Sequence, residues 1–210
     1  MWIKKVGITV TALWLLVAGC SASAVANDEV TAHEVVEQMT VKLVSTIDQY
    51  RVGFEQDPQP FYLALEGLLD EALDFKWISY NVMGPYRKQA TPEQLDRFVM
   101  RFRRDLVETY GGGLVAFGQQ DIVVLPPNED LSGRRTVHVL QEIRGEDGNY
   151  PLQYTMGQKR SGEWKITNVI INGVNLGKTF RNQFIQRAQK FNGDLDRVID
   201  DWSVSSESGA

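Results

Sequence analysis

Residues 145–156, GEDGNYPLQYTM, decide the fold class of this chain. The stretch opens with two glycines separated by acidic residues and followed by an asparagine, which is typical of a tight turn. Leu152, Tyr154 and Met156 then alternate with polar side chains. This period of two predicts a half-buried β-strand that leaves a turn.

Further strand-like runs flank this stretch. A β-branched run covers residues 121–125 and ends at two prolines, and a longer run covers residues 136–143. On the other side, a turn at residues 161–163 precedes an apolar run over residues 164–171. Consecutive strands joined by short turns predict an antiparallel meander.

Apolar residues recur at helical spacing before and after the predicted strands. Apolar residues at steps of three and four predict helices over residues 29–50, 61–73, 75–83, 91–110, 176–191 and 195–202. The clearest start is Thr91-Pro92, because Thr91 and Gln94 form a capping box and proline fits the first turn. We expect the glycines at 111–113 to end that helix. Helices, then strands, then a closing helix predict an α+β fold in which helices cover one face of a curved sheet.

The N-terminus resembles an export signal. Lys4 and Lys5 precede an uncharged run at residues 6–19, whose 14 residues are fewer than the roughly 20 needed to span a bilayer. Residues 24–26, AVA, predict cleavage after Ala26 and release of the protein. Residues 17–20, VAGC, resemble a bacterial lipobox, which would instead lipidate Cys20 and tether the protein.

Composition limits the chemistry of the exported part. Cleavage after Ala26 leaves 184 residues, which predicts a single domain over residues 27–202 and a disordered tail at 203–210. This part carries 20 basic and 27 acidic side chains, so we expect no nucleic-acid partner. The sequence contains two histidines, and no H-E-x-x-H, C-x-x-C, G-x-S-x-G or phosphate-loop motif. We therefore expect no metal site and no cofactor.

Several segments together resemble the MlaC family, periplasmic phospholipid-carrying proteins also known as toluene-tolerance auxiliary components of an ABC transport system. The resemblance rests on residues 84–94 (GPYRKQATPEQ), 98–110, 150–154, 162–176 and 180–184. Their order and spacing match over about residues 31–202.

The resemblance implies an NTF2-like curved sheet of four to five strands that encloses an apolar pocket. It implies a non-enzymatic, monomeric, soluble periplasmic carrier, which favours cleavage after Ala26 over lipidation. Its partners would be phospholipid, an outer-membrane lipoprotein complex and an inner-membrane ABC transporter. Shuttling between the two complexes would maintain outer-membrane lipid asymmetry.

A phospholipid carrier must shield about 30 methylenes from water, at about 0.8 kcal/mol each. Twelve mostly aromatic residues are candidates for the lining of such a pocket, although aromatic side chains at helical spacing also form ordinary cores. They are Trp77, Val82, Met83, Tyr86, Phe98, Phe102, Tyr110, Tyr154, Trp164, Val174, Phe180 and Phe184.

Arg97, Arg101 and Arg104 share one helix face by their four- and three-residue steps. They could attract anionic headgroups or an acidic partner, or form a solvated helix face. Two other classes of protein remain alternatives. One is an enzyme with the same cone-shaped fold that acts on a small hydrophobic substrate, which needs a pair of ionisable groups in the cavity. Asp121, His138 and Glu142 lie on predicted strands, but the sequence does not fix which face of the sheet they occupy, and they form no convincing pair. The other is a tethered lipoprotein that binds another protein.

Overall fold

The structure, a computed structural model, describes residues 30–204 apart from 118–119, 128–129 and 146–147. The predicted signal peptide, Cys20 and residues 205–210 of the predicted tail lie outside the described residues. Within this part of the chain there are six α-helices and two short 3₁₀ turns, at Arg51–Gly53 and Gly84–Lys88. The helices are α1 Ala32–Tyr50, α2 Gln59–Ala72, α3 Phe75–Val82, α4 Pro92–Phe117, α5 Leu176–Lys190 and α6 Leu195–Asp200.

The predicted meander is present as one antiparallel sheet with the strand order β1-β2-β3-β4-β5. Tyr154 on β3 lies opposite Val139 on β2 and Val169 on β4. The short fifth strand pairs with β4 and leads directly into α5. The predicted α+β class with about five strands is therefore confirmed. The strands are β1 Asp121–Val124, β2 Thr136–Gly145, β3 Gly148–Gln158, β4 Trp164–Ile171 and β5 Val174–Asn175.

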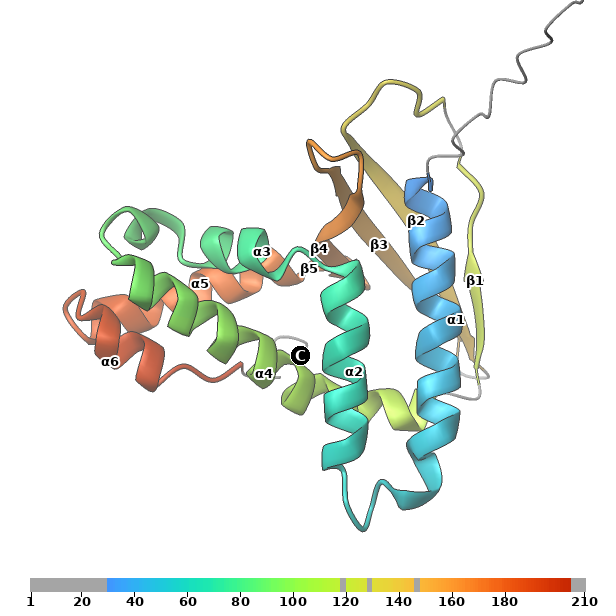
Figure 1. Ribbon diagram of the computed structural model, residues 1–210, viewed down its shortest axis with the longest axis horizontal. Helices are drawn as coiled ribbons and strands as arrows, with labels where there is room; N and C mark the ends of the chain where they lie inside the picture. Colours follow the sequence, from blue (N-terminus) through green and yellow to red (C-terminus); the bar gives the residue numbers. More distant parts are fainter. Residues whose placement is uncertain (1–29, 118–119, 128–129, 146–147, 205–210) are drawn as a thin grey trace, which may run out of the picture.

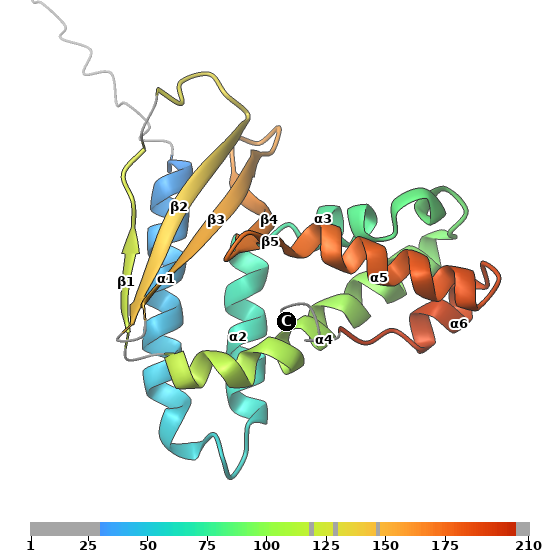
Figure 2. The ribbon, with the colours of Figure 1, turned by 180° about the vertical axis from the view of Figure 1, so that it is seen from behind.

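The molecule has two lobes (Figures 1 and 2). In the sheet lobe, α1 and α2 lie across one face of the sheet. In the helical lobe, α3, α5, α6 and the first half of α4 pack together beside the sheet. α4 belongs to both lobes, because its C-terminal half crosses α2, in front of it in the view of Figure 2, and ends at α1.

The sheet lobe has its own core between α1, α2 and the inner face of the strands. Val36, Val139, Met156 and Ile166 are fully buried there. A polar chain crosses this core: Tyr154 Oη donates to Gln141 Oε1 over 2.7 Å, and Gln141 Nε2 donates to Thr40 Oγ1 over 2.6 Å. Since buried polar groups need partners, this chain fixes how α1 lies on the sheet.

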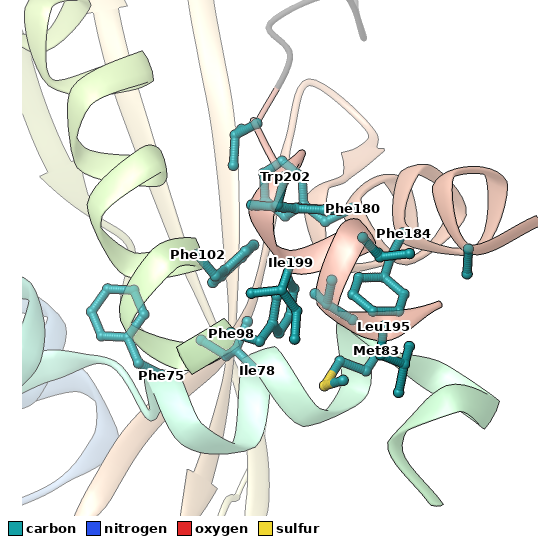
Figure 3. Packing of buried hydrophobic residues seen from close by; sticks show 14 residues of the cluster. Phe75, Ile78, Met83, Phe98, Phe102, Phe180, Phe184, Leu195, Ile199 and Trp202 are labelled. Atoms are coloured by element: carbon teal, nitrogen blue, oxygen red, sulfur yellow. The ribbon is translucent and has the colours of Figure 1, made fainter. Parts of the chain in front are cut away.

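The helical lobe has an aromatic core (Figure 3). Phe98 contacts Phe184 and Trp202 edge-to-face, with ring centroids 4.9 and 5.2 Å apart. Phe102 contacts Phe180 in the same geometry at 5.4 Å. Trp202 is fully buried, so the second residue after the last helix completes this core.

α4 does not end where the sequence analysis expected. The capping box at its start is present, since Thr91 Oγ1 accepts from Gln94 N and Gln94 Oε1 accepts from Thr91 N. The helix then continues through the three glycines to Phe117, so the predicted end was wrong. A Cβ on Gly111 would lie 3.1 Å from both Tyr62 and Leu65. The glycine is needed for close helix packing, and not for a turn.

The C-terminal segment packs further than expected. Ser203 O and Oγ accept from the Arg187 guanidinium, and Val204 is buried. Thr109 Oγ1 also donates to Val204 O. Ser203 and Val204, which we expected to fray, are therefore bound to α4 and α5.

Candidate functional site

The structure divides the twelve predicted pocket residues between several places. Tyr154 belongs to the sheet-lobe core, and the half-buried Trp164 packs against it. Val174 lies on β5 and is partly buried, whereas Trp77 on α3 is 49% exposed. The other eight belong to the helical-lobe core or pack against it: Val82, Met83, Tyr86, Phe98, Phe102, Tyr110, Phe180 and Phe184.

One cleft lies where the two lobes meet. This inter-lobe cleft has a volume of about 590 Å³, within the usual range of small-molecule sites. The side chains of Trp77, Ile78 and Val82 give it an apolar wall on α3. Two of the predicted residues, Trp77 and Val82, are thus brought together there. Its remaining lining residues are mostly polar: Asn81, Thr155, Thr167, Asn168, Asn175, Gly177, Lys178, Arg181 and Asn182.

Side-chain hydrogen bonds hold the α5 wall of the cleft. Asn168 Oδ1 on β4 accepts from Gly177 N over 3.0 Å, and Asn175 Oδ1 caps α5 by accepting from Lys178 N over 2.9 Å. A Cβ on Gly177 would lie 2.5 Å from Asn168 Oδ1, so any other residue here would displace the Asn168 side chain from its hydrogen bond. The start of α5 is therefore fixed against the sheet.

Arg181 joins this wall to α3. Its Nε donates to Asn81 O over 2.6 Å, and its Nη2 lies 3.4 Å from Asn81 Oδ1. Arg181 and Lys178 place two cations at the rim of an apolar-walled cleft. An anionic group bound above an apolar chain would find both kinds of partner here.

A second groove lies between α1, α2 and the β3–β4 turn, with a volume of about 430 Å³. Met39, Leu68 and Trp164 are among its apolar lining residues, and Lys42 and Glu71 form an ion pair at its rim. Of the predicted residues, only Trp164 lines this groove. Trp164 also lines a third cleft, which lies near the start of α1.

The predicted arginine face is largely neutralised. Arg97 bonds Asp196 over 2.6 Å and Asp200 over 2.5 Å, which ties α4 to α6. Arg101 Nε donates to Asp105 Oδ2 and to Trp202 O, both over 3.1 Å. With Arg104, these arginines line a small cleft of about 280 Å³. The sequence analysis did not select Lys178 and Arg181, although their three-residue spacing on α5 placed them on one face.

The ionisable strand residues do not meet in the inter-lobe cleft. Asp121 and Glu142 both pair with Arg144, over 3.9 and 3.2 Å. His138 is exposed, and its Nδ1 lies 3.5 Å from Thr155 Oγ1. In the part of the chain that the structure describes, no group of three His, Cys, Asp or Glu side chains could hold a metal ion.

Burial raises the pKa values of three groups elsewhere, one of which is the Tyr110 hydroxyl on α4. Desolvation raises the pKa of the Asp105 carboxyl, although the hydrogen bond from Arg101 acts in the opposite direction. Desolvation also raises the pKa of Tyr154 well above its usual value, so its hydroxyl stays protonated and continues to donate to Gln141. All three groups lie outside the lining of the inter-lobe cleft.

These features define a class: an α+β protein whose sheet lobe and helical lobe meet at an apolar-walled cleft with a cationic rim. The chain belongs to the MlaC protein family, whose model matches residues 37–204. This confirms the resemblance predicted from the sequence.

Three relatives are informative. The toluene tolerance protein ttg2D of Pseudomonas putida is 38% identical over 175 residues, covering 82% of this chain and 80% of its own. The intermembrane phospholipid transport system binding protein MlaC of Haemophilus influenzae is 23% identical over 152 residues, 70% of each chain. A phospholipid-binding protein from Ralstonia solanacearum, solved in complex with a phospholipid, has a TM-score of 0.70 and 25% identity, covering 80% of this chain and 97% of its own. The names of the second and third relatives describe phospholipid-binding proteins, and the name of the second also places it in a transport system.

Proposed function

We propose that this protein is a phospholipid carrier and that the inter-lobe cleft receives the acyl chains of its cargo. The observation that carries the proposal is the apolar α3 wall beneath a cationic rim, in a chain similar to a protein solved with a bound phospholipid. Trp77, Ile78 and Val82 would contact the chains, and Lys178 and Arg181 would face the headgroup. Phospholipid is cargo in this proposal, and no cofactor is required.

The size of the cargo requires the cleft to widen. A phospholipid with two chains carries about 30 methylenes, and burying them is worth about 0.8 kcal/mol each. A cleft of about 590 Å³ is too small to shield all of them. The lobes would therefore separate around the cargo, with the segment between α2 and α3 as the pivot.

Contacts of the segment between α2 and α3 with β4 support this pivot. Leu73 pairs with Ile166 on β4, and Asp74 N donates to Ile166 O over 3.0 Å. Lys165 Nζ donates to Glu71 O, one residue before the end of α2. The pivot and the first turn of α5, which Asn168 holds against β4, would thus stay attached to the sheet while α3 and the rest of α5 move away from its outer face.

The wider role follows from the family. The carrier would be exported, with cleavage after Ala26, and would work as a soluble monomer in the periplasm. It would shuttle phospholipid between an outer-membrane lipoprotein complex and an inner-membrane ABC transporter, and so maintain outer-membrane asymmetry. Among the described residues, no helix combines the length and apolar character needed to cross a membrane.

A matched pair of substitutions on α5 tests the location of the cargo. Asn182 is exposed and lines the inter-lobe cleft, and Gln186 is exposed one turn further along the same helix but outside that lining. We expect Asn182→Trp to fill the cleft and lower the phospholipid bound per protein at least severalfold, and Gln186→Trp to leave it unchanged. Lipid extraction of both variants, purified without detergent, measures the difference. Equal lipid content in the two variants would move the cargo to another site.

A further inference from the structure

A cationic surface covers the α3–α5 side of the helical lobe. Figure 1 shows α3 and α5 side by side there. This surface, which we name the cationic face, consists of Lys76, Arg87, Lys88, Lys178 and Arg181. Arg181 lines both the inter-lobe cleft, with Lys178, and a neighbouring basic cleft of about 540 Å³, with Arg87 and Lys88. The two clefts therefore form one continuous surface.

An aromatic ring holds two of these cations in place. The Arg87 guanidinium lies 4.6 Å from the centroid of the Tyr80 ring, and Lys76 Nζ lies 5.8 Å from the same centroid. Tyr80 itself lines the basic cleft. Cation–π contacts of this kind order the side chains without neutralising their charge.

The charge of the cationic face is not compensated. Neither of its two clefts has an aspartate or glutamate in its described lining, and none of its five cations forms an ion pair with a described carboxylate. Other arginines of this lobe behave differently: Arg97 pairs with Asp196, and Arg187 with Asp201. The chain as a whole has a net charge of −5, so this face is a local exception that favours an anionic partner.

We infer that the cationic face docks on a bilayer surface that contains anionic phospholipids, and that the inter-lobe cleft then opens toward the bilayer. The inference rests on the proposed carrier function and names the partner of its cleft. The chemistry of the face matches the layers of a bilayer, because Lys178 and Arg181 lie beside the apolar wall of the cleft and Trp77 of that wall is half-exposed. Tryptophan favours the boundary between headgroups and hydrocarbon, and basic residues favour anionic headgroups. An acidic protein surface would match the cations but not the apolar wall and the tryptophan.

Vesicle sedimentation tests this inference. We expect the protein to bind vesicles of phosphatidylcholine mixed with phosphatidylglycerol, to bind vesicles of phosphatidylcholine alone much more weakly, and to dissociate from the mixed vesicles at high salt. The double variant Lys76→Gln/Lys88→Gln should reduce partitioning onto the mixed vesicles roughly tenfold or more, because each basic residue near an anionic surface contributes on the order of fivefold. Both lysines are exposed and lie outside the lining of the inter-lobe cleft.

The matched control is Arg160→Gln/Lys190→Gln, which removes the same charge from exposed positions outside the cationic face. It should leave partitioning within about twofold of the unmodified protein. Equal binding to both kinds of vesicle, or an equal effect of the two double variants, would overturn the inference. Salt-sensitive retention on immobilised polyglutamate without vesicle binding would also overturn it and assign the face to an acidic protein.

Lipid extraction of the same samples separates the two proposals. If docking fails but purified protein still carries phospholipid, the carrier function stands and the docking surface does not. If the purified protein carries no lipid and takes none from vesicles, the carrier function fails, whatever the result of sedimentation.

Discussion

Asp105 on α4 is a carboxyl group that is only 7% exposed and lies beside arginine side chains. Burial raises its pKa against the opposing hydrogen bond from Arg101. In the unfolded chain the group titrates near its ordinary value of about 3.8. At neutral pH the ionised carboxylate therefore disfavours folding, and this contribution disappears as the pH falls through the raised pKa.

The variant Asp105→Asn removes this titration. We expect the free energy of unfolding of the unmodified protein, minus that of the variant, to increase as the pH falls from neutral to about 4, because the folded protein takes up the proton first. Urea unfolding of both proteins at several pH values measures the difference. A difference that stays constant or decreases on acidification would contradict the burial argument.

For single residues, the sequence predicted which side chains are buried better than it predicted which elements they contact. Helical spacing correctly placed Phe98 and Phe102 on an apolar face, but it carries no information about which elements that face meets. The structure packs them against Trp202, about one hundred residues later in the chain. Trp77 has the same apolar character but lies half-exposed at the inter-lobe cleft, and nothing in the local sequence distinguishes the two cases.

The start of α4 is determined by residues close together in sequence, whereas its end is determined by residues far away in sequence. The start of α4 depends on Thr91, Pro92 and Gln94, which are adjacent in sequence, so it was predictable. The continuation of α4 through residues 111–113 depends on Tyr62 and Leu65 of α2, which lie far away in sequence. Glycine weakens a helix on its own, and only tertiary packing compensates for it.

Two glycines of α4 provide a direct test of this packing. A Cβ on Gly113 would meet no atom within 4 Å, whereas a Cβ on Gly111 would lie 3.1 Å from Tyr62 and Leu65. We expect Gly113→Ala to raise the free energy of unfolding by about 0.5–1 kcal/mol, the usual gain of alanine over glycine in a helix. Gly111→Ala should gain less or lose stability, because α2 must yield to the new methyl group.

Thermal or urea unfolding of the two alanine variants measures which substitution raises the free energy of unfolding more. If Gly111→Ala were as stabilising as Gly113→Ala, the close approach of α4 to α2 would not explain why the glycine is there.

At the scale of the whole molecule, the relation between the lobes creates the candidate site. Sequence periodicity predicted the strands, the helices and the α+β class, because each of these depends on neighbouring residues. The inter-lobe cleft instead combines α3, the sheet and α5, which are separated by up to about one hundred residues. Its cationic rim was therefore missed, and the more concentrated arginines of α4 were selected in its place.

The two-lobed arrangement also gives the carrier a way to enclose cargo larger than the present cleft. The lobes share α4, the segment between α2 and α3 and the junction between β5 and α5, and each lobe has its own apolar core. Each core can therefore stay packed while the cleft between the lobes widens. We propose accordingly that the space between the two lobes holds a phospholipid.

Native mass spectrometry with lipid extraction, on protein expressed from the full sequence and purified without detergent, tests this claim most directly. We predict a protein ion carrying phospholipid at a fixed stoichiometry, with a mature chain that begins at Asn27 rather than at a lipidated Cys20. An empty protein that also takes up no phospholipid from vesicles would contradict the claim.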